Sequence, residues 1–356
     1  MPSGNAPRMR LVVAGATGNL GTSLLQALER EESVESVLGL ARRLPQLDFA
    51  RTEWARADIS NDDLVPLFRG ADAVVHLAWL IQPSRDLATL RGTNVTGTKR
   101  LLDAIREARV PALVYASSVG AYSRGPKDRR VDEAWPTDGI PTSFYSRHKA
   151  EVERMLDAFE REAPDVRVVR MRPGLIFKRE AASGIRRLFA GPLLPGFLLR
   201  RELIPIVPRI DRLRFQAVHS LDVGEAFRLA VTNEVRGAFN VAAEPIVDSD
   251  ELGRLLGARP VPIPAPLLRG AANISWHLRL QPSPPGWIDL ALGVPIMDTS
   301  RAKDELGWKP RYSSGEALID LLEGIREGAG LHTPPLDRDT GGPLRVREFQ
   351  TGVGGR

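Results

Sequence analysis

Near its start the chain runs from an apolar strand through a glycine-rich turn into a helix, in the order Leu11-Val-Val-Ala-Gly15-Ala-Thr-Gly18-Asn-Leu-Gly21. Glycines at these positions permit a tight turn, bring the backbone close to a pyrophosphate and let helix amides face the anion. Glycine spacing alone also fits an ordinary strand-to-helix turn, but the flanking strand and helix favour a dinucleotide site. We therefore expect the following residues to hold the cofactor: Gly15, Thr17, Gly18, Asn19, Leu20 and Gly21.

The first half of the chain alternates short apolar runs with helical patterns, which is typical of parallel βαβ units. The predicted strands are residues 10–14, 34–40, 52–56, 73–77, 112–116 and 166–172, and the predicted helices are 20–30, 61–68, 86–108 and 145–163. The pattern predicts an α/β fold with a doubly wound parallel Rossmann sheet over residues 10–172, whose ligands lie beyond the carboxyl ends of the strands.

The pattern changes after residue 172. Residues 173–208 are rich in proline, glycine and leucine without sustained alternation, and residues 260–266 and 282–285 read as loops. Further strands are expected at 217–219 and 238–242, and helices at 223–231, 300–306 and 315–326. We expect residues 173–330 to form a smaller substrate-binding region whose segment at about 216–243 returns to the sheet. Residues 1–9 and 331–356 are expected to be tails, the second one flexible.

Composition excludes several kinds of site. The 356 residues include no cysteine, so disulfides, thiolate catalysis and cysteine-ligated zinc are excluded. The five histidines are scattered, and we expect no metal. The formal charge is +5, but basic and acidic residues are mixed, and we expect no nucleic acid partner. No apolar run approaches the roughly 20 residues of a membrane span. No signal peptide is evident, so we expect a cytoplasmic protein with no membrane partner.

A tyrosine and a lysine stand four residues apart in Tyr145-Ser-Arg-His-Lys149. On a helix these positions share a face, and a nearby ammonium favours the phenolate and lowers the pKa of the tyrosine. Such a phenol is a usable acid or base at working pH. Ser118 follows the strand at 112–116 and is placed to hold a carbonyl or alcohol oxygen beside the Tyr145 phenol. A dinucleotide site and a proton-transfer group on one chain indicate hydride chemistry.

The end of the second strand bears on the choice of cofactor. Where an acid would bind the adenosine ribose, the chain has Ala41-Arg42-Arg43. Arg42 and Arg43 can pair with a 2′-phosphate, which favours NADP over NAD, although a solvated arginine pair is the alternative. Asp58 and Ile59 follow the third strand and can contact the adenine edge, but an ordinary loop aspartate fits almost as well.

Taken together these residues resemble the extended short-chain dehydrogenase/reductase family, also described as the NAD-dependent epimerase/dehydratase family. The resemblance covers residues 10–329. Besides the motifs above, its matching pieces are His76-Leu-Ala78, Asn94-Val-Thr-Gly97-Thr98, Ser117-Ser118, Arg172-Pro173, Val218-His219-Ser-Leu-Asp222-Val223 and Phe239-Asn240-Val241.

The resemblance implies a role for each matching residue. Tyr145 is the general acid/base, Lys149 lowers its pKa and holds the nicotinamide ribose, and Ser118 polarises the reacting oxygen. Asn94 supports the geometry or a water chain to Lys149. Leu77 and Ala78 lie under the cofactor, and Pro173 borders the nicotinamide pocket. Relatives also suggest a homodimer through residues 86–108 and 145–163, although apolar helix faces there fit a core equally well.

Departures from the family pattern bear on the reaction. Val119-Gly120 stands where 4,6-dehydratases carry an Asp-Glu pair, so dehydration is disfavoured. Arg212 and Arg214 stand where relatives hold a nucleotide diphosphate, although a solvated basic loop fits as well. We therefore expect an NAD(P)-dependent oxidoreductase acting at a sugar-nucleotide or related carbonyl or alcohol carbon. The alternatives are an NADPH-dependent carbonyl reductase with a non-nucleotide substrate and a non-catalytic dinucleotide sensor.

Overall fold

A parallel sheet of seven strands forms the centre of the protein. The computed structural model describes residues 8–81, 85–189, 204–281 and 283–338. The strand order is β11-β7-β5-β4-β1-β2-β3, with every pair parallel. The strands are β1 (Met9–Ala14), β2 (Val34–Ala41), β3 (Thr52–Arg56), β4 (Ala73–His76), β5 (Ala112–Ala116), β7 (Arg167–Pro173) and β11 (Gly237–Val241). The order reverses between β1 and β4, which confirms the predicted doubly wound sheet.

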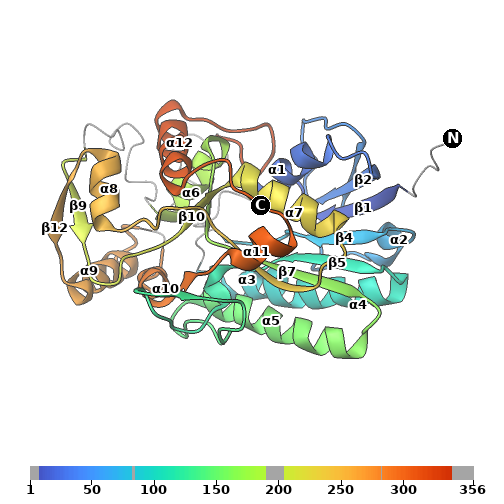
Figure 1. The fold of residues 1–356 in the computed structure, drawn as a ribbon, viewed down its shortest axis with the longest axis horizontal. Coiled ribbons are helices and arrows are strands. Elements are labelled where there is room, and N and C mark those ends of the chain that lie inside the picture. The colour runs from blue at the N-terminus through green and yellow to red at the C-terminus, as the bar shows by residue number, and fades with distance from the viewer. Residues whose placement is uncertain (1–7, 82–84, 190–203, 282, 339–356) are drawn as a thin grey trace.

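Helices cover both faces of the sheet (Figure 1). One layer contains α1 (Asn19–Leu28) and α7 (Ser220–Thr232), and the other contains α2 (Val65–Phe68), α4 (Thr98–Ala108) and α5 (Phe144–Glu162). Alternate residues of β1 enter the two layers: Leu11 and Val13 pack with α1 and α7, whereas Val12 packs in the other core. Strands buried on both faces read as continuous apolar runs, as the sequence of β1 does.

The predicted helix at 86–108 is not one regular helix. It consists of α3 (Leu87–Arg91), a π-helical segment (Gly92–Gly97) and α4. Single π-turns within helices are often found at functional sites, and this one carries Asn94. The helix predicted at 61–68 is also shorter and begins only at Val65.

The C-terminal half returns one strand to the sheet. β11 pairs with β7 in the main sheet, whereas β10 (Ala217–His219) pairs with β8 (Leu175–Phe177) outside it. The remaining elements are η2 (Val119–Ala121), β6 (Arg130–Val131), η3 (Arg179–Ala181), α6 (Ala182–Phe189), β9 (Ile206–Arg209), α8 (Ser249–Leu256), β12 (Arg259–Pro262), α9 (Ala265–His277), α10 (Gly286–Gly293), β13 (Ile296–Met297), α11 (Ser300–Glu305) and α12 (Ser314–Glu327). The sequence pattern missed α8, α9 and α10 and read β12 as a loop.

Residues expected to be a tail include packed positions. Thr333 and Leu336 are 1% and 3% exposed, while residues 339–356 lie outside the described part of the chain. Among the described residues, no helix combines the length and apolarity needed to cross a bilayer.

Candidate active site

The glycine turn lies at the carboxyl ends of β1 and β4. Gly15 has φ +87°, and a Cβ there would lie 2.6 Å from the backbone nitrogen of Ala78. At Gly21 a Cβ would lie 2.4 Å from the carbonyl oxygen of Ala16. Side chains are therefore excluded from both positions, and the turn packs directly against the backbone of Leu77 and Ala78.

The start of α1 has free capacity for an anion. Gly18 is the N-cap and supplies no side-chain acceptor to the first-turn amides. Asn19 Nδ2 donates to the carbonyl oxygen of Ile176 at 3.3 Å, while its buried Oδ1 has no partner among the described residues. A pyrophosphate would accept hydrogen bonds from the backbone amides in the first turn of α1, so the turn fits the dinucleotide that the sequence predicts.

Tyr145 lies in the first turn of α5, whose N-cap is Ser143. Its side chain is buried, with 9% of its surface exposed, and a Cβ at Gly120 would come within 2.7 Å of its ring. Burial raises the pKa of Tyr145 to about 12, against the lowering effect of a hydrogen bond with Ser118. The structure thus brings the predicted phenol and serine hydroxyl together.

Lys149 does not lower the pKa of Tyr145 in this arrangement, which corrects the expectation from the sequence. Its Nζ donates to the carbonyl oxygen of Ala116 at 2.6 Å and to the Tyr115 hydroxyl at 3.3 Å. Burial lowers the pKa of Lys149 well below its ordinary value, although the charge of Glu153 opposes this. A shared helix face brings the two side chains into one region, but the tertiary contacts of the amine determine where its charge acts.

Asn94 holds the loop that follows β4. Its Oδ1 accepts from the backbone nitrogen of Leu80 at 2.7 Å, and its Nδ2 donates to the Leu80 carbonyl oxygen at 3.0 Å. The carbonyl oxygen of Asn94 accepts from Thr98 Oγ1, which also bonds His76 Nε2 at 2.9 Å. Asn94 is fully buried and therefore positions the segment 77–81 beside Tyr145.

Two indole rings flank the phenol of Tyr145. The ring of Trp287, from α10, has its centroid 5.2 Å from that of Tyr145, and Trp79 meets Tyr145 edge-on at 6.1 Å. Lys149 Nζ lies 3.5 Å from the centre of the Trp79 ring. Apolar side chains of the same cluster are Leu80, Ile81, Leu90, Val119, Ile140, Phe144, Leu290 and Val294. The wall around Tyr145 is therefore largely aromatic and aliphatic.

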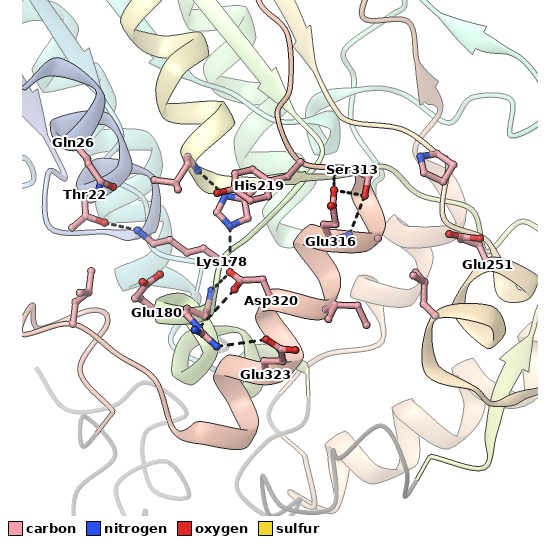
Figure 2. A pocket seen from close by; sticks show the side chains of 18 of the residues that line it. Thr22, Gln26, Lys178, Glu180, His219, Glu251, Ser313, Glu316, Asp320 and Glu323 are labelled. Carbon is pink, nitrogen blue, oxygen red and sulfur yellow. Dashed lines mark hydrogen bonds and ion pairs between the residues drawn. The ribbon is translucent and has the colours of Figure 1, made fainter. Parts of the chain in front are cut away.

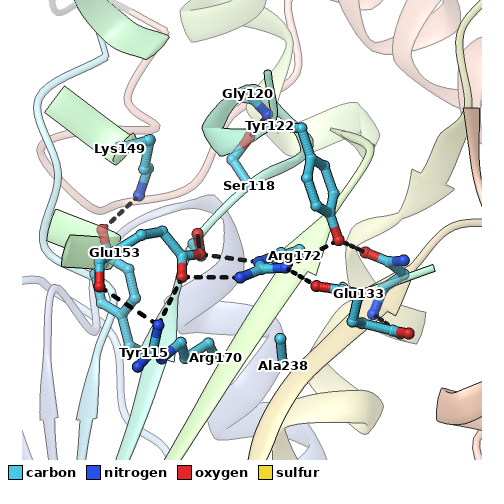
Figure 3. Close-up of polar contacts among 12 residues, drawn as sticks. Tyr115, Ser118, Gly120, Tyr122, Glu133, Lys149, Glu153, Arg170, Arg172 and Ala238 are labelled. Carbon is cyan, nitrogen blue, oxygen red and sulfur yellow. Dashed lines mark hydrogen bonds and ion pairs between the residues drawn. The ribbon is translucent and has the colours of Figure 1, made fainter. Parts of the chain in front are cut away.

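A buried ionic network lies beneath the site and was missed in the sequence (Figure 3). Glu153 is fully buried, accepts from Ser117 Oγ at 2.5 Å and forms two 2.9 Å hydrogen bonds with Arg172. Arg170 Nη1 also donates to Glu153 at 3.1 Å. Burial alone would raise the pKa of Glu153, but Arg172, Ser117 and Arg170 lower it to about 2. Its position four residues after Lys149 on one helix face was the available sequence signal.

The network joins three strands that end at the site. Arg172 Nη1 donates to the Tyr122 hydroxyl at 3.0 Å, and that hydroxyl donates to Asn240 Oδ1 at 2.7 Å. Ser117 precedes Ser118, and Arg172 precedes the buried Pro173 at the end of β7. The network therefore fixes β5, β7 and β11 relative to α5.

Comparison with known proteins agrees with this arrangement. The model of the NAD dependent epimerase/dehydratase family matches residues 11–242. The chain belongs to this family. An uncharacterized protein of Mycobacterium tuberculosis is 28% identical over 356 residues, covering 96% of this chain and 88% of its own length.

Of two further proteins similar to this family member, one is named by its activity and the other was solved with a ligand. A 4-hydroxy-2-methyl-3-oxo-4-farnesyl-3,4-dihydroquinoline-1-oxide ketoreductase of Stigmatella aurantiaca is 28% identical over 182 residues, covering 51% of this chain and 54% of the relative. The UDP-glucose 4-epimerase of Thermus thermophilus, solved with NAD, superposes with a TM-score of 0.66 at 20% identity, covering 89% of this chain and 99% of the epimerase. Likeness at that identity shows a shared fold.

The end of β2 in this family member is followed by two arginines and not by an acid. Arg42 and Arg43 follow β2 and are exposed, and burial together with the charge of Arg42 lowers the pKa of Arg43. Asp58 Oδ1 accepts from the backbone nitrogen of Ser60, so this carboxylate stabilises a turn. Ile59 is 5% exposed and packs near Gly97. The arginine pair is therefore the accessible charged group here.

Arg212 and Arg214 lie together with a lysine that the sequence did not indicate. Lys127 Nζ donates to the carbonyl oxygens of Arg214 and Ala291, while Arg214 Nη1 donates to the Lys127 carbonyl oxygen. Burial, with the charges of Arg212 and Arg214, lowers the pKa of Lys127 to about 7. No ion pair of these three cations is found among the described residues. The group is thus a concentrated positive charge next to α10.

A large cavity lies away from this group, between α1, α7 and α12 (Figure 2). Its volume is about 910 Å³. Lys178 Nζ donates to Thr22 Oγ1 at 2.7 Å and to Ser23 Oγ at 3.1 Å, and His219 Nε2 is 3.2 Å from Asp320 Oδ2. Its lining includes neither the glycines of the turn nor Tyr145, so this cavity is separate from both.

Proposed function

We propose that this protein is an NAD(P)-dependent oxidoreductase of the epimerase/dehydratase type. It moves a hydride to or from a carbonyl or alcohol carbon of a sugar nucleotide or related substrate. The observation that carries this proposal is the proximity of Tyr145 and Ser118 at the sheet edge that also holds the glycine turn. A Cβ on Gly120 would lie 2.7 Å from the Tyr145 ring and 3.4 Å from Ser118 Oγ. Family membership supports the same reaction class.

Each residue has a defined part in the proposed reaction. Ser118 donates a hydrogen bond to the substrate oxygen and fixes it beside the phenol. Tyr145 gives its proton to that oxygen during reduction and takes it back during oxidation. The bound nicotinamide supplies or accepts the hydride. Lys149 is a buried amine one helical turn away, and we expect it to contact the nicotinamide ribose and to favour the phenolate when it does.

NADP is the preferred dinucleotide in this proposal. Arg42 and Arg43 are exposed where an NAD-specific site would place an acid. Two guanidinium groups attract a 2′-phosphate, whereas a carboxylate would repel it.

The decisive experiment is the substitution Tyr145→Phe. It removes the transferable proton and keeps the ring, so turnover should be abolished while the dissociation constant for NADP changes less than about twofold. Tyr312→Phe is the matched control, because Tyr312 stacks on His219 in the separate cavity. Unchanged turnover in Tyr145→Phe would rule out the proposed mechanism.

A second candidate is an NADPH-dependent carbonyl reductase with a non-nucleotide substrate. The observation in its favour is the wall of Trp79, Trp287 and aliphatic side chains around Tyr145, which suits an apolar ketone. The named activity of the Stigmatella relative is also a ketone reduction. The positive group of Lys127, Arg212 and Arg214 instead suits a nucleotide diphosphate.

Two measurements separate the candidates. An epimerase that keeps its cofactor should retain NAD through purification, whereas a reductase should release it. Thermal-shift assays compare NAD, NADP, UDP-sugars and lipophilic ketones as ligands. Only one of the two substrate classes, UDP-sugars or ketones, should raise the melting temperature.

A further inference from the structure

Helix α9 has a lipophilic outer surface. None of the 13 residues of α9 is buried, and the helix lies at the edge of the C-terminal half, beside α8, β12 and α10 (Figure 1). The exposed fractions of Leu267, Ile274 and Leu278 are 66%, 62% and 64%. Few large apolar side chains elsewhere in the described chain are as exposed.

The exposed residues share one face. Leu267, Ala271, Ile274 and Leu278 are spaced i, i+4, i+7 and i+11, the spacing of a single stripe along a helix. A Cβ added at Gly270 on this side would meet no atom within 4 Å. Leu280, 52% exposed, extends the stripe past the helix end. A surface helix normally turns such a stripe toward the core, so α9 has the inverse orientation.

The stripe is bordered by positive charge. Residues 252–288 contain four arginines. Arg254 and Arg269 form ion pairs with Glu251 and Asp289, which leaves Arg259 and Arg279 without an ion pair among the described residues. Arg279 is exposed at the end of α9 and forms no ion pair with the described residues. The guanidinium of Arg85 lies 4.3 Å from the centre of the Trp276 ring. Exposed leucine and isoleucine side chains flanked by arginines complement an anionic lipid surface.

We propose that the outer face of α9 binds the surface of an anionic lipid bilayer, with the helix lying in the interfacial plane. The absence of a sequence segment long enough to span a membrane led to the expectation of no membrane partner, but a helix lying on the surface needs no such length. A second copy of the chain is a poorer occupant, because stable interfaces use roughly 20–30 residues a side. The stripe offers only a few side chains.

The proposed surface is connected to the candidate site. The chain leads from α9 into α10, which carries Trp287 against Tyr145. Arg85, which contacts Trp276, lies shortly after the segment containing Trp79. Docking at α9 therefore brings the aromatic wall of the site close to the lipid surface. The proposal does not depend on the reaction catalysed.

The test is co-sedimentation of the full chain with lipid vesicles. Wild-type protein should bind phosphatidylglycerol-containing vesicles, bind phosphatidylcholine vesicles much more weakly, and lose affinity as salt rises from about 0.1 to about 0.5 M. The double substitution Leu267→Glu/Ile274→Glu should weaken binding at least about tenfold, and Arg279→Glu at least about fivefold. Ile206→Glu, at a site 53% exposed on β9, is the matched control and should bind like wild type.

Each other outcome overturns the proposal. Wild-type protein that does not sediment with anionic vesicles at low salt contradicts it, as does equal binding by the double variant. Light scattering tests the competing occupant: a dimer that dissociates in Leu267→Glu/Ile274→Glu, without vesicle binding, assigns the stripe to a second copy. All substituted positions are exposed, and circular dichroism melting verifies that the variants remain folded.

Discussion

Glu153 and Arg172 form a two-point ion pair inside the protein, with Oε1 accepting from Nε and Oε2 from Nη2, both at 2.9 Å. The side chain of Glu153 is 0% exposed and that of Arg172 is 5% exposed. Paired geometry of this kind compensates the desolvation of both charges. The pair lies between the serine strand, the tyrosine helix and the strand that ends at Pro173, so it positions the site without contacting a substrate.

Replacing Glu153 by Gln should destabilise the protein strongly. The change leaves Arg172 buried without its carboxylate, and breaking such a pair costs about 3–5 kcal/mol of unfolding free energy. The measurement is urea unfolding. Glu151→Gln is the matched control, because Glu151 lies on the same helix as Glu153 and forms a partly exposed ion pair with Arg91 of α3. Breaking that pair should cost at most about 1 kcal/mol. Equal losses in the two variants would contradict the interior role of Glu153.

Replacing Gly120 by Ala should impair turnover more than cofactor binding. The new Cβ would lie 2.7 Å from the Tyr145 ring and 3.4 Å from Ser118 Oγ, so the ring must shift. A displacement of this order costs about 100-fold in kcat, whereas NADP affinity should persist. Gly270→Ala, where the added atom meets open space, is the control and should leave kcat unchanged. Normal kcat in Gly120→Ala would show that the ring tolerates displacement.

Lys178 should make stability rise with pH. Burial lowers its pKa from 10.5 in an unfolded chain to about 8. Between about pH 8 and pH 10.5 the unfolded state binds more protons at this amine than the folded state does. The unfolding free energy therefore increases as pH rises through this window. Relative to Lys178→Met, wild-type protein should gain about 3 kcal/mol between pH 7 and about 10.5.

Denaturant titrations of wild type and Lys178→Met at several pH values measure this gain. Lys99→Met controls for the loss of an ammonium, because the side chain of Lys99 is 66% exposed. A difference between wild type and Lys178→Met that stays constant with pH would refute the prediction.

Replacing Arg42 and Arg43 together by Ser should change cofactor preference. The two guanidinium groups are expected to pair with the 2′-phosphate, so NADP affinity should fall at least about tenfold while NAD affinity stays the same. Isothermal titration with both dinucleotides measures this ratio. Arg30→Ser, at another exposed position, should alter neither affinity. A parallel loss for NAD and NADP would indicate that the arginines do not read the phosphate.

Several features of the site followed directly from local sequence. Gly15 and Gly21 are required wherever a strand turns tightly into a helix, and the structure places backbone atoms where their side chains would be. Tyr145 and Lys149 fall on one helix because the period of 3.6 residues is local. The returning strand β11 was also predicted, since its apolar run follows a helix as in a βαβ unit.

Other features depended on segments far apart in the chain. The ionic network of Glu153 joins α5 to β5 and β7. The spacing of Glu153 from Lys149 was a local signal, but it does not show that the carboxylate is buried against Arg172. The positive group is not a local motif, because Lys127 lies 85 and 87 positions before Arg212 and Arg214 and meets them only in the folded protein. Of the missed helices, α8 carried local signals in its Asp248 N-cap and its Gly257 C-cap, whereas α9 turns its apolar stripe outward.

The sequence by itself determined the sheet, the glycine turn and the placement of the Tyr145 phenol on one helix with Lys149, because strand alternation, turn chemistry and helical period act over a few residues. Only the tertiary structure decided which groups surround that phenol. Burial beneath Trp79 and Trp287 raises its pKa to about 12, although a hydrogen bond with Ser118 opposes this effect. Desolvation depends on the packing of the whole fold, and a motif of five residues does not specify that packing.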